Sequence, residues 1–142
     1  MLVDGGKPDR LVWPGDIIIS APSKFVSTGN LDVVKNGLDS LLIRQQSDGR
    51  LPYAGRSYPV LLSDTYHLYT LIDVYYYYMY PGELEFLEKY WNQYKLDLNY
   101  SLSEIDSSAM INVTSSNDWG RTGMGGHNIE VVQCRAVLKL SC

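Results

Sequence analysis

The sequence predicts an all-α chain made of stacked αα-hairpins. Four segments carry apolar residues at helical spacing, and turn-forming residues separate them. Residues 28–34 resemble residues 81–87, which lie fifty-three positions later. In each copy a helix ends, a glycine turns the chain, and a leucine stands at the same place in the next helix. A period of about fifty residues that contains two helices is typical of stacked hairpins.

The first predicted pair of helices covers residues 16–28 and about 30–47. Asp16 is the expected N-cap of the first helix, and Gly29 ends it. Asn30 is the expected cap of the second helix. The apolar faces that predict these helices are Ile17, Ile18, Ala21, Phe25 and Val26, followed by Leu31, Val34, Leu38, Leu41 and Leu42.

The second predicted pair covers about 61–80 and 83–105, with a Pro-Gly turn between them. The helix over 61–80 is apolar nearly all round, which is typical of a helix that lines the inside of a larger assembly. Its tyrosines between 75 and 80 point several ways because consecutive helical residues are about 100° apart, so most of these rings are expected to pack. A fifth helix is expected near Asn128. The predicted apolar face of the fourth helix is Leu84, Leu87, Trp91, Tyr94 and Leu98.

Two long polar loops, at about 48–59 and 106–128, each follow the second helix of a pair. This placement favours a toroid whose loops converge on one face, although a linear helical solenoid would show the same repeat. Six hairpins of this period would need roughly 300 residues. The 142 residues therefore predict an incomplete ring.

Composition excludes several classes of function. The formal charge is −4, and acidic and basic residues are mixed, which argues against a nucleic-acid surface. No apolar run is long enough to span a bilayer, so no membrane partner is expected. The two histidines lie far apart with no cysteine or histidine at ligand spacing, so neither a metal site nor a cofactor is predicted.

Cellular location is left unassigned by the sequence. The tripeptides that begin at Asn99 and Asn112 match the glycosylation sequon and suggest a secreted ancestor. Only three residues precede Asp4, so no signal peptide is expected in the sequence as given. Both cysteines, Cys134 and Cys142, lie in the last nine residues, where they could pair without forming a disulfide scaffold.

The segment 4–16 carries the strongest functional signal. It combines three carboxylates, two cations and a tryptophan with several glycines and prolines. In a sugar-processing site, one carboxyl donates a proton, others hold hydroxyls, and an indole faces the apolar side of a pyranose. The alternative is a solvated loop that leads into the first helix.

Several motifs occur in a specific order along residues 4–130. They are Asp9-Arg10-Leu11-Val12-Trp13-Pro14-Gly15-Asp16, Ser47-Asp48-Gly49-Arg50-Leu51-Pro52-Tyr53-Ala54-Gly55, Thr65-Tyr66-His67-Leu68-Tyr69, Asn117-Asp118-Trp119 and Gly123-Met124-Gly125-Gly126-His127-Asn128-Ile129-Glu130. In this order they resemble the α-L-rhamnosidase-like six-hairpin glycosidases, especially the fungal ones. The resemblance implies part of an (α/α)6 toroid and an inverting glycoside hydrolase whose partner is a rhamnose-containing glycan or glycoside.

The resemblance also implies roles for individual residues. Asp9 corresponds to the general acid, although the family usually has glutamate there and Pro8 replaces a commonly charged residue. The alternative for Asp9 is an ordinary loop aspartate. His127 is interpreted as a ligand contact or as a loop-to-helix hydrogen bond, of which the hydrogen bond is favoured. His67 is interpreted as a satisfied core residue rather than a catalyst. The substrate-binding residues implied are Asp4, Arg10, Trp13, Asp16, Asp118, Trp119 and His127.

The predicted domain organisation is a partial six-hairpin glycosidase domain at 1–130 and a divergent tail at 131–142. The family supplies its general base from a hairpin that would lie beyond the end of this chain, so the expected protein is hydrolase-like but catalytically incomplete. Two alternatives stay open. One is a non-catalytic remnant that binds carbohydrate, and the other is an αα-hairpin module that binds a protein or self-associates through exposed hairpin faces.

Overall fold

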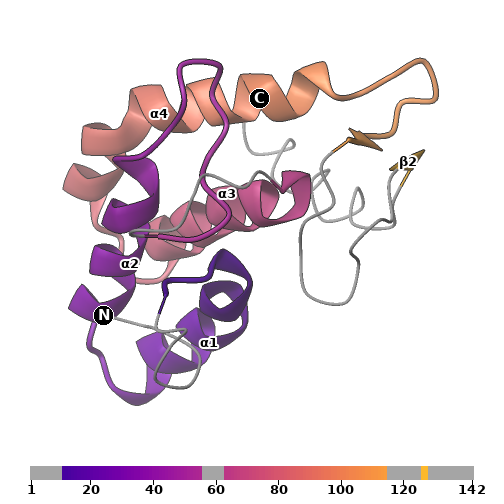
Figure 1. Ribbon diagram of the computed structural model, residues 1–142. Coiled ribbons are helices and arrows are strands. Elements are labelled where there is room, and N and C mark those ends of the chain that lie inside the picture. Colours follow the sequence, from indigo (N-terminus) through magenta and orange to yellow (C-terminus); the bar gives the residue numbers. More distant parts are fainter. Residues whose placement is uncertain (1–10, 56–62, 115–125, 128–142) are drawn as a thin grey trace.

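The computed structural model describes residues 11–55, 63–114 and 126–127. The expected fifth helix near Asn128 and the tail at 131–142 lie outside these residues. The described elements are helices α1 (Pro14–Ser27), α2 (Asp32–Leu42), α3 (Asp64–Met79) and α4 (Leu84–Ser103), and the two-residue antiparallel strands β1 (Asn112–Val113) and β2 (Gly126–His127) (Figure 1). The prediction of a mostly helical chain is confirmed.

Helices that are equivalent in the repeat lie side by side and run in the same direction. The ring of Trp13, just before α1, meets Tyr66 in the first turn of α3, fifty-three residues later. Phe25 in the last turn of α1 meets Tyr77 near the end of α3. Contacts at both ends therefore align α1 with α3 from start to finish. The repeat in the sequence is thus also a repeat in space.

Side chains connect α2 with α4 in the same parallel order. Near their first turns, Lys35 of α2 forms an ion pair with Glu83, the residue before α4. Further along, Lys89 of α4 contacts Asp39 of α2 at 3.1 Å. Just after α2, the Gln45 side chain donates to the Gln93 carbonyl at 2.8 Å. Each hairpin therefore contributes one helix to each of two adjacent rows.

Helix α3 forms the centre of the described structure because it packs against α1, α2 and α4 (Figure 1). Most of its residues are buried, as its uniform apolar character predicts. Its exposed apolar side chains are confined to the end of the helix, at Tyr78 and Met79, and to the following Tyr80. The other three helices cover the remaining apolar side chains of α3 that the structure describes.

The N-caps differ from those predicted. Trp13 caps α1, and Pro14 begins the helix, where the missing N–H of proline costs no intrahelical bond. Asp16 lies in the first turn instead, a position where a carboxylate interacts favourably with the helix dipole. Leu31, rather than Asn30, caps α2, and neither cap uses a side-chain hydrogen bond. Helix α2 ends at Leu42, five residues before the predicted end at Ser47.

The buried face of α4 is rotated from the predicted one. Leu84 is 52% exposed and Trp91 is 45% exposed, although both were predicted to face the core. The spacing of apolar residues alone misplaced the buried face of α4, because the polar residues Asp97 and Ser101 are buried together with the aromatic ones. The buried residues of α4 are Phe86, Tyr90, Tyr94, Asp97, Leu98 and Ser101.

The tyrosines at the end of α3 point several ways, as predicted. Tyr77 is fully buried, Tyr76 is half-buried and Tyr78 is exposed. The Tyr77 hydroxyl donates to the Glu83 carboxylate, and burial with this bond raises the pKa of Tyr77. Tyr80 stacks on Phe25 with ring centroids 5.4 Å apart, so these rings hold the end of α1 against the turn between α3 and α4.

Each long loop returns to the start of the first helix of its own hairpin. The Gly55 N–H donates to the Val12 carbonyl at 2.8 Å, which attaches the loop after α2 to the entry of α1. The Thr114 N–H donates to the Asp64 carboxylate at 2.8 Å, which attaches the loop after α4 to the start of α3. Because α1 and α3 are parallel, both attachments lie at the same end of the hairpin stack.

Candidate functional site

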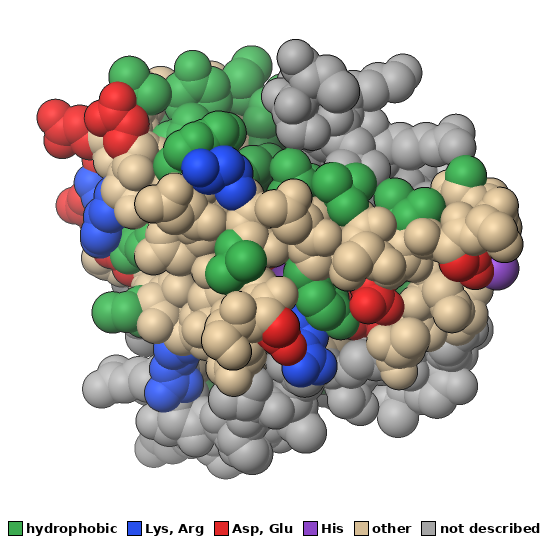
Figure 2. Space-filling view, turned by 90° about the horizontal axis from the view of Figure 1, so that it is seen from above, with side chains coloured by type: hydrophobic (Ala, Val, Ile, Leu, Met, Phe, Trp, Pro, Cys, Tyr) green, Lys and Arg blue, Asp and Glu red, His purple; other side chains and the backbone are tan. Residues whose placement is uncertain are grey.

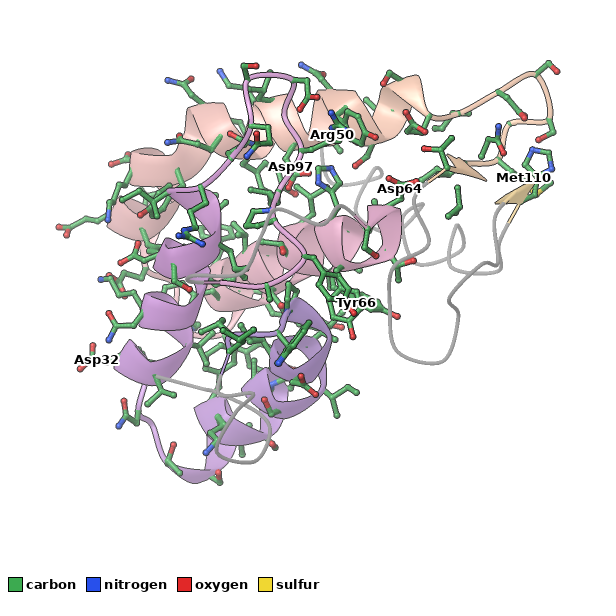
Figure 3. All side chains as sticks on the ribbon, viewed as in Figure 1. Asp32, Arg50, Asp64, Tyr66, Asp97 and Met110 are labelled. Carbon is green, nitrogen blue, oxygen red and sulfur yellow. The ribbon has the colours of Figure 1, made fainter. Side chains whose placement is uncertain are left out.

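Four aromatic rings gather at the end of the stack where the loops return. This aromatic cluster consists of Trp13, Tyr53 from the loop after α2, and Tyr66 and Tyr69 on successive turns of α3. Tyr53 lies 4.9 Å from Trp13 and 4.9 Å from Tyr66 between ring centroids. Tyr66 lies 5.9 Å from Tyr69. Figure 3 labels Tyr66, the central ring of the four.

The rings differ in exposure. Trp13 is 7% exposed and Tyr66 is 6% exposed, so both are packing residues in this structure. Tyr53 and Tyr69 are half-buried. A ligand that approached this end would therefore meet the two outer tyrosines before the indole. The role of Trp13 as a direct wall of a sugar pocket stays a prediction, while its packing role is observed.

Asp16 lies beside the cluster in the first turn of α1, and it is exposed. Its neighbour Gly15 permits the close approach of Tyr66, because a Cβ at Gly15 would lie 3.1 Å from the Tyr66 ring. The start of α1 thus carries an exposed carboxylate three residues after Trp13, whose carbonyl accepts the Asp16 N–H at 3.1 Å. Aromatic faces with a nearby carboxylate are the residue types that bind the apolar and hydroxyl sides of a sugar.

The loop that carries Tyr53 is held by a specific set of contacts. The Asp48 carboxylate accepts from the Arg50 backbone at 3.1 Å and from Arg50 Nε at 2.8 Å, and this pairing lowers the pKa of Asp48. The Gln45 side chain donates to the Gly49 carbonyl at 2.9 Å. Gly49 is required here, since its φ is +104° and a Cβ would lie 2.5 Å from the Leu96 carbonyl oxygen.

His67 connects this loop to both helices of the second hairpin. Its Nδ1 accepts the Leu51 N–H at 3.0 Å, and its Nε2 faces the Asp97 carboxylate and, at 3.3 Å, the Asp97 carbonyl. An acceptor at Nδ1 requires the proton on Nε2, so the geometry is that of a neutral imidazole that donates to Asp97. Burial raises the pKa of Asp97 to about 6 although His67 opposes the shift. The interpretation of His67 as a satisfied core residue is confirmed.

Asp64 is a residue of this end that the sequence analysis did not identify. It is the first residue of α3, is 4% exposed, and accepts from the Thr114 N–H and, at 3.3 Å, from the Thr114 hydroxyl. Figure 3 shows it at the end of α3 that lies toward β1. Its position after the N-cap Ser63 was the available signal, because a carboxylate there favours helix initiation.

His127 lies in β2 and contacts the loop after α4, not the aromatic cluster. Its Nε2 lies 2.7 Å from the Asp106 carboxylate and 3.2 Å from the Ser108 hydroxyl. The Ser108 hydroxyl itself donates to Asp106 at 2.6 Å, so Asp106 is the shared acceptor. Bonds from Ser108 and His127 lower the pKa of Asp106 to about 2. Because the Ser108 hydroxyl donates its proton to Asp106, His127 does not act as a general base toward Ser108 in this arrangement. The role observed for His127 is a hydrogen bond within the loop.

Five predicted site residues lie outside the described residues: Asp4, Asp9, Arg10, Asp118 and Trp119. Of the predicted set, Trp13 lies in the aromatic cluster and Asp16 follows it in the first turn of α1. Within residues 11–55, 63–114 and 126–127, no three histidine, cysteine or acidic side chains form a group that could hold a metal ion. No helix in these ranges has the length and apolar character needed to cross a membrane.

No known family pattern matches this chain, and no curated protein matches it.

Proposed function

We propose that this chain is part of an α-L-rhamnosidase-like six-hairpin glycosidase and binds carbohydrate at the aromatic cluster. The proposal includes an (α/α)6 arrangement for the complete ring. The observation that carries this proposal is that three of the motifs that resemble the glycosidase family meet at one end of the helical stack. Trp13 comes from the first motif, Tyr53 from the second, and Tyr66 and Tyr69 from the third.

The parallel pairing of the hairpins also supports this proposal. In a ring of hairpins, equivalent helices are neighbours that run the same way, and all loops of one kind open on one face. The contacts of Trp13 with Tyr66 and of Lys35 with Glu83 follow that rule for two hairpins. The Asp9 carboxyl precedes this cluster by four residues in the chain, which is consistent with a proton donor beside a bound sugar.

The proposed activity of the chain alone is binding without efficient hydrolysis. Inversion at an anomeric carbon needs an acid on the leaving oxygen and a base that activates water on the opposite face. The resemblance assigns the acid to Asp9 and assigns no base to any residue present. Half-buried Tyr53 and Tyr69, with Asp16 nearby, are the groups proposed to contact the sugar.

Calorimetric or fluorescence titration with L-rhamnose and an aryl α-L-rhamnoside tests this proposal. Tyr53→Ala and Tyr69→Ala are each expected to weaken binding by about tenfold, equivalent to about 1.4 kcal/mol. Tyr78→Ala is the matched control, because Tyr78 is exposed at the opposite end of α3. Absence of rhamnoside binding, or an equal loss in the control, would contradict the proposal.

A second candidate function is a protein-interaction module without carbohydrate binding. The burial of Trp13 favours it, since an indole at 7% exposure offers little surface to a sugar. The exposed apolar side chains of α4 favour it as well. A chain that binds no sugar but self-associates would support this candidate over the first.

A further inference from the structure

The solvent side of α4 carries a ridge of apolar and charged residues that nothing in the described fold covers. Leu84, Glu88, Trp91 and Lys95 are exposed, and they follow one another at spacings of four, three and four. Residues at these spacings lie on one side of a helix. Leu102 continues this α4 ridge toward the end of the helix and is 39% exposed, whereas Leu98 on the same side of the helix is buried.

The α4 ridge presents an ordered aromatic side chain at the surface, between an acidic and a basic residue. Trp91 is stacked on Tyr94 with an interplanar angle of 10°, so the indole is held flat against the helix. Lys95 Nζ lies 5.8 Å from the Trp91 ring centroid. Figure 2 views the molecule from the side on which α4 lies and shows hydrophobic side chains at the surface among charged ones. An ordered, partly exposed tryptophan is the residue type that most often anchors an interface.

The pattern of the ridge is complementary to its own antiparallel copy. A two-fold axis through Trp91 places Glu88 opposite Lys95 of the second copy, and Lys95 opposite Glu88 of that copy. The same axis places Leu84 about one helical turn from Leu102 of the second copy, so two exposed leucines can approach each other at each end of the contact. A two-fold interface must be self-complementary in this way. A parallel arrangement of the two α4 helices would instead place Glu88 opposite Glu88 and Lys95 opposite Lys95 of the second copy.

We infer that α4 binds α4 of a second copy of this chain and forms an antiparallel homodimer centred on Trp91. The helix has 20 residues and is therefore about 30 Å long, which suits a contact of several turns. A single helix pair buries less surface than a large obligate interface, so the dimer is expected to be weak and dependent on concentration. The inference does not depend on the proposed sugar site, which lies at the ends of α1 and α3.

Charge reversal tests the antiparallel register directly. Glu88→Lys and Lys95→Glu each remove both intersubunit pairs and create two like-charge contacts, so each is expected to weaken dimerisation by about tenfold in sedimentation equilibrium. The double variant Glu88→Lys/Lys95→Glu restores both pairs and is expected to dimerise like the natural chain. Trp91→Ala is expected to weaken the dimer without changing its salt dependence.

Glu85→Lys is the matched control, because Glu85 is an exposed residue of the same helix about 120° away from Trp91. It changes the net charge as Glu88→Lys does and is expected to leave dimerisation unchanged. Circular dichroism confirms that each variant keeps its helices. A natural chain that stays monomeric at all concentrations overturns the inference. So does a double variant no stronger than the single ones, or a control that weakens the dimer equally.

Discussion

At the scale of single residues, two carboxyls lie fully inside the helical core, and their surroundings differ. Asp97 faces His67, so a donor stabilises its charge. Asp73 has no hydrogen-bond partner for either oxygen, and burial raises its pKa well above the ordinary value. An unpaired buried carboxyl favours its neutral form because water cannot solvate the charge. Ionisation of Asp73 is therefore expected to lower the free energy of unfolding as the pH rises.

Replacing Asp73 with Asn is expected to increase stability at neutral pH. The pKa of Asp73 is raised in the folded chain, so between the unfolded and folded pKa values only the folded state keeps the proton. The natural chain then loses about 1.4 kcal/mol per pH unit relative to Asp73→Asn, and the two converge near pH 4. Urea unfolding of both proteins from pH 4 to 8 measures this. A constant difference across that range would contradict the prediction.

Replacing His67 with Ala is expected to destabilise the fold by about 3–5 kcal/mol. The change leaves the buried Asp97 carboxylate and the Leu51 N–H without their observed partner. His127→Ala is the matched control and is expected to change stability by less than about 1 kcal/mol, because its pair with Asp106 is exposed. Thermal or urea unfolding compares them, and similar losses would show that burial of the His67 pair is unimportant.

At the scale of elements, the loop after α2 determines where the aromatic cluster forms. Gly49 lets this loop pass against the backbone of α4, and Gly55 lets it reach Val12. A Cβ at Gly55 would lie 2.5 Å from the Ser40 hydroxyl oxygen, so α2 itself limits that position to glycine. These two close approaches hold Tyr53 beside Trp13 and Tyr66.

Gly49→Ala is expected to cost about 3 kcal/mol, through an unfavourable positive φ and a clash with the Leu96 carbonyl. Gly29→Ala is expected to cost about 1 kcal/mol, since Gly29 also has a positive φ but has no atom within 4 Å of its Cβ position. Chemical denaturation of both variants measures the difference, which isolates the steric contact with α4. Equal losses would mean that the loop moves away from α4 without cost.

At the scale of the whole molecule, α3 joins the two hairpins because it contacts the other three helices. The side chains that link α2 with α4 hold the outer row, where Glu83 pairs with Lys35 and also accepts from the Tyr77 hydroxyl of α3. The described fold therefore has one shared core rather than two independent hairpins. The proposed sugar site and the proposed dimer ridge lie on separate parts of it.

The far-ultraviolet circular dichroism of the purified chain is expected to show the two-minimum spectrum of α-helices. The four helices contain most of the described residues, while each strand contains two. A spectrum dominated by β-structure would contradict the fold.

The chain alone is expected to show little turnover of an aryl α-L-rhamnoside. An acid without an opposed base contributes at most about 10²–10⁴-fold acceleration, and an open site loses the contribution of positioning. Comparison of the natural chain with Asp9→Asn measures the share of the proposed acid. Robust hydrolysis that disappears in Asp9→Asn would show that the chain or its dimer contains a complete site.

The positions of the four helices follow from local features of the sequence. Apolar spacing near 3.6 residues and the turns at Gly29 and at Pro81-Gly82 act over a few neighbours, so they are readable without the fold. The repeat also anticipated which helices are equivalent. Helix starts were less predictable, because the cap at Trp13 depends on the backbone that Pro14 imposes and not on the carboxylate of Asp16.

Which residues meet depends on contacts between distant segments, and these required the fold. Trp13, Tyr53 and Tyr66 form one cluster because the loop after α2 folds back to α1, an event that no local pattern encodes. His67 finds its partners sixteen and thirty residues away. The exposure of Trp91 likewise depends on how α4 rotates against α3. Local spacing determines the helices, whereas the packing energy of the whole chain determines which of their faces are buried.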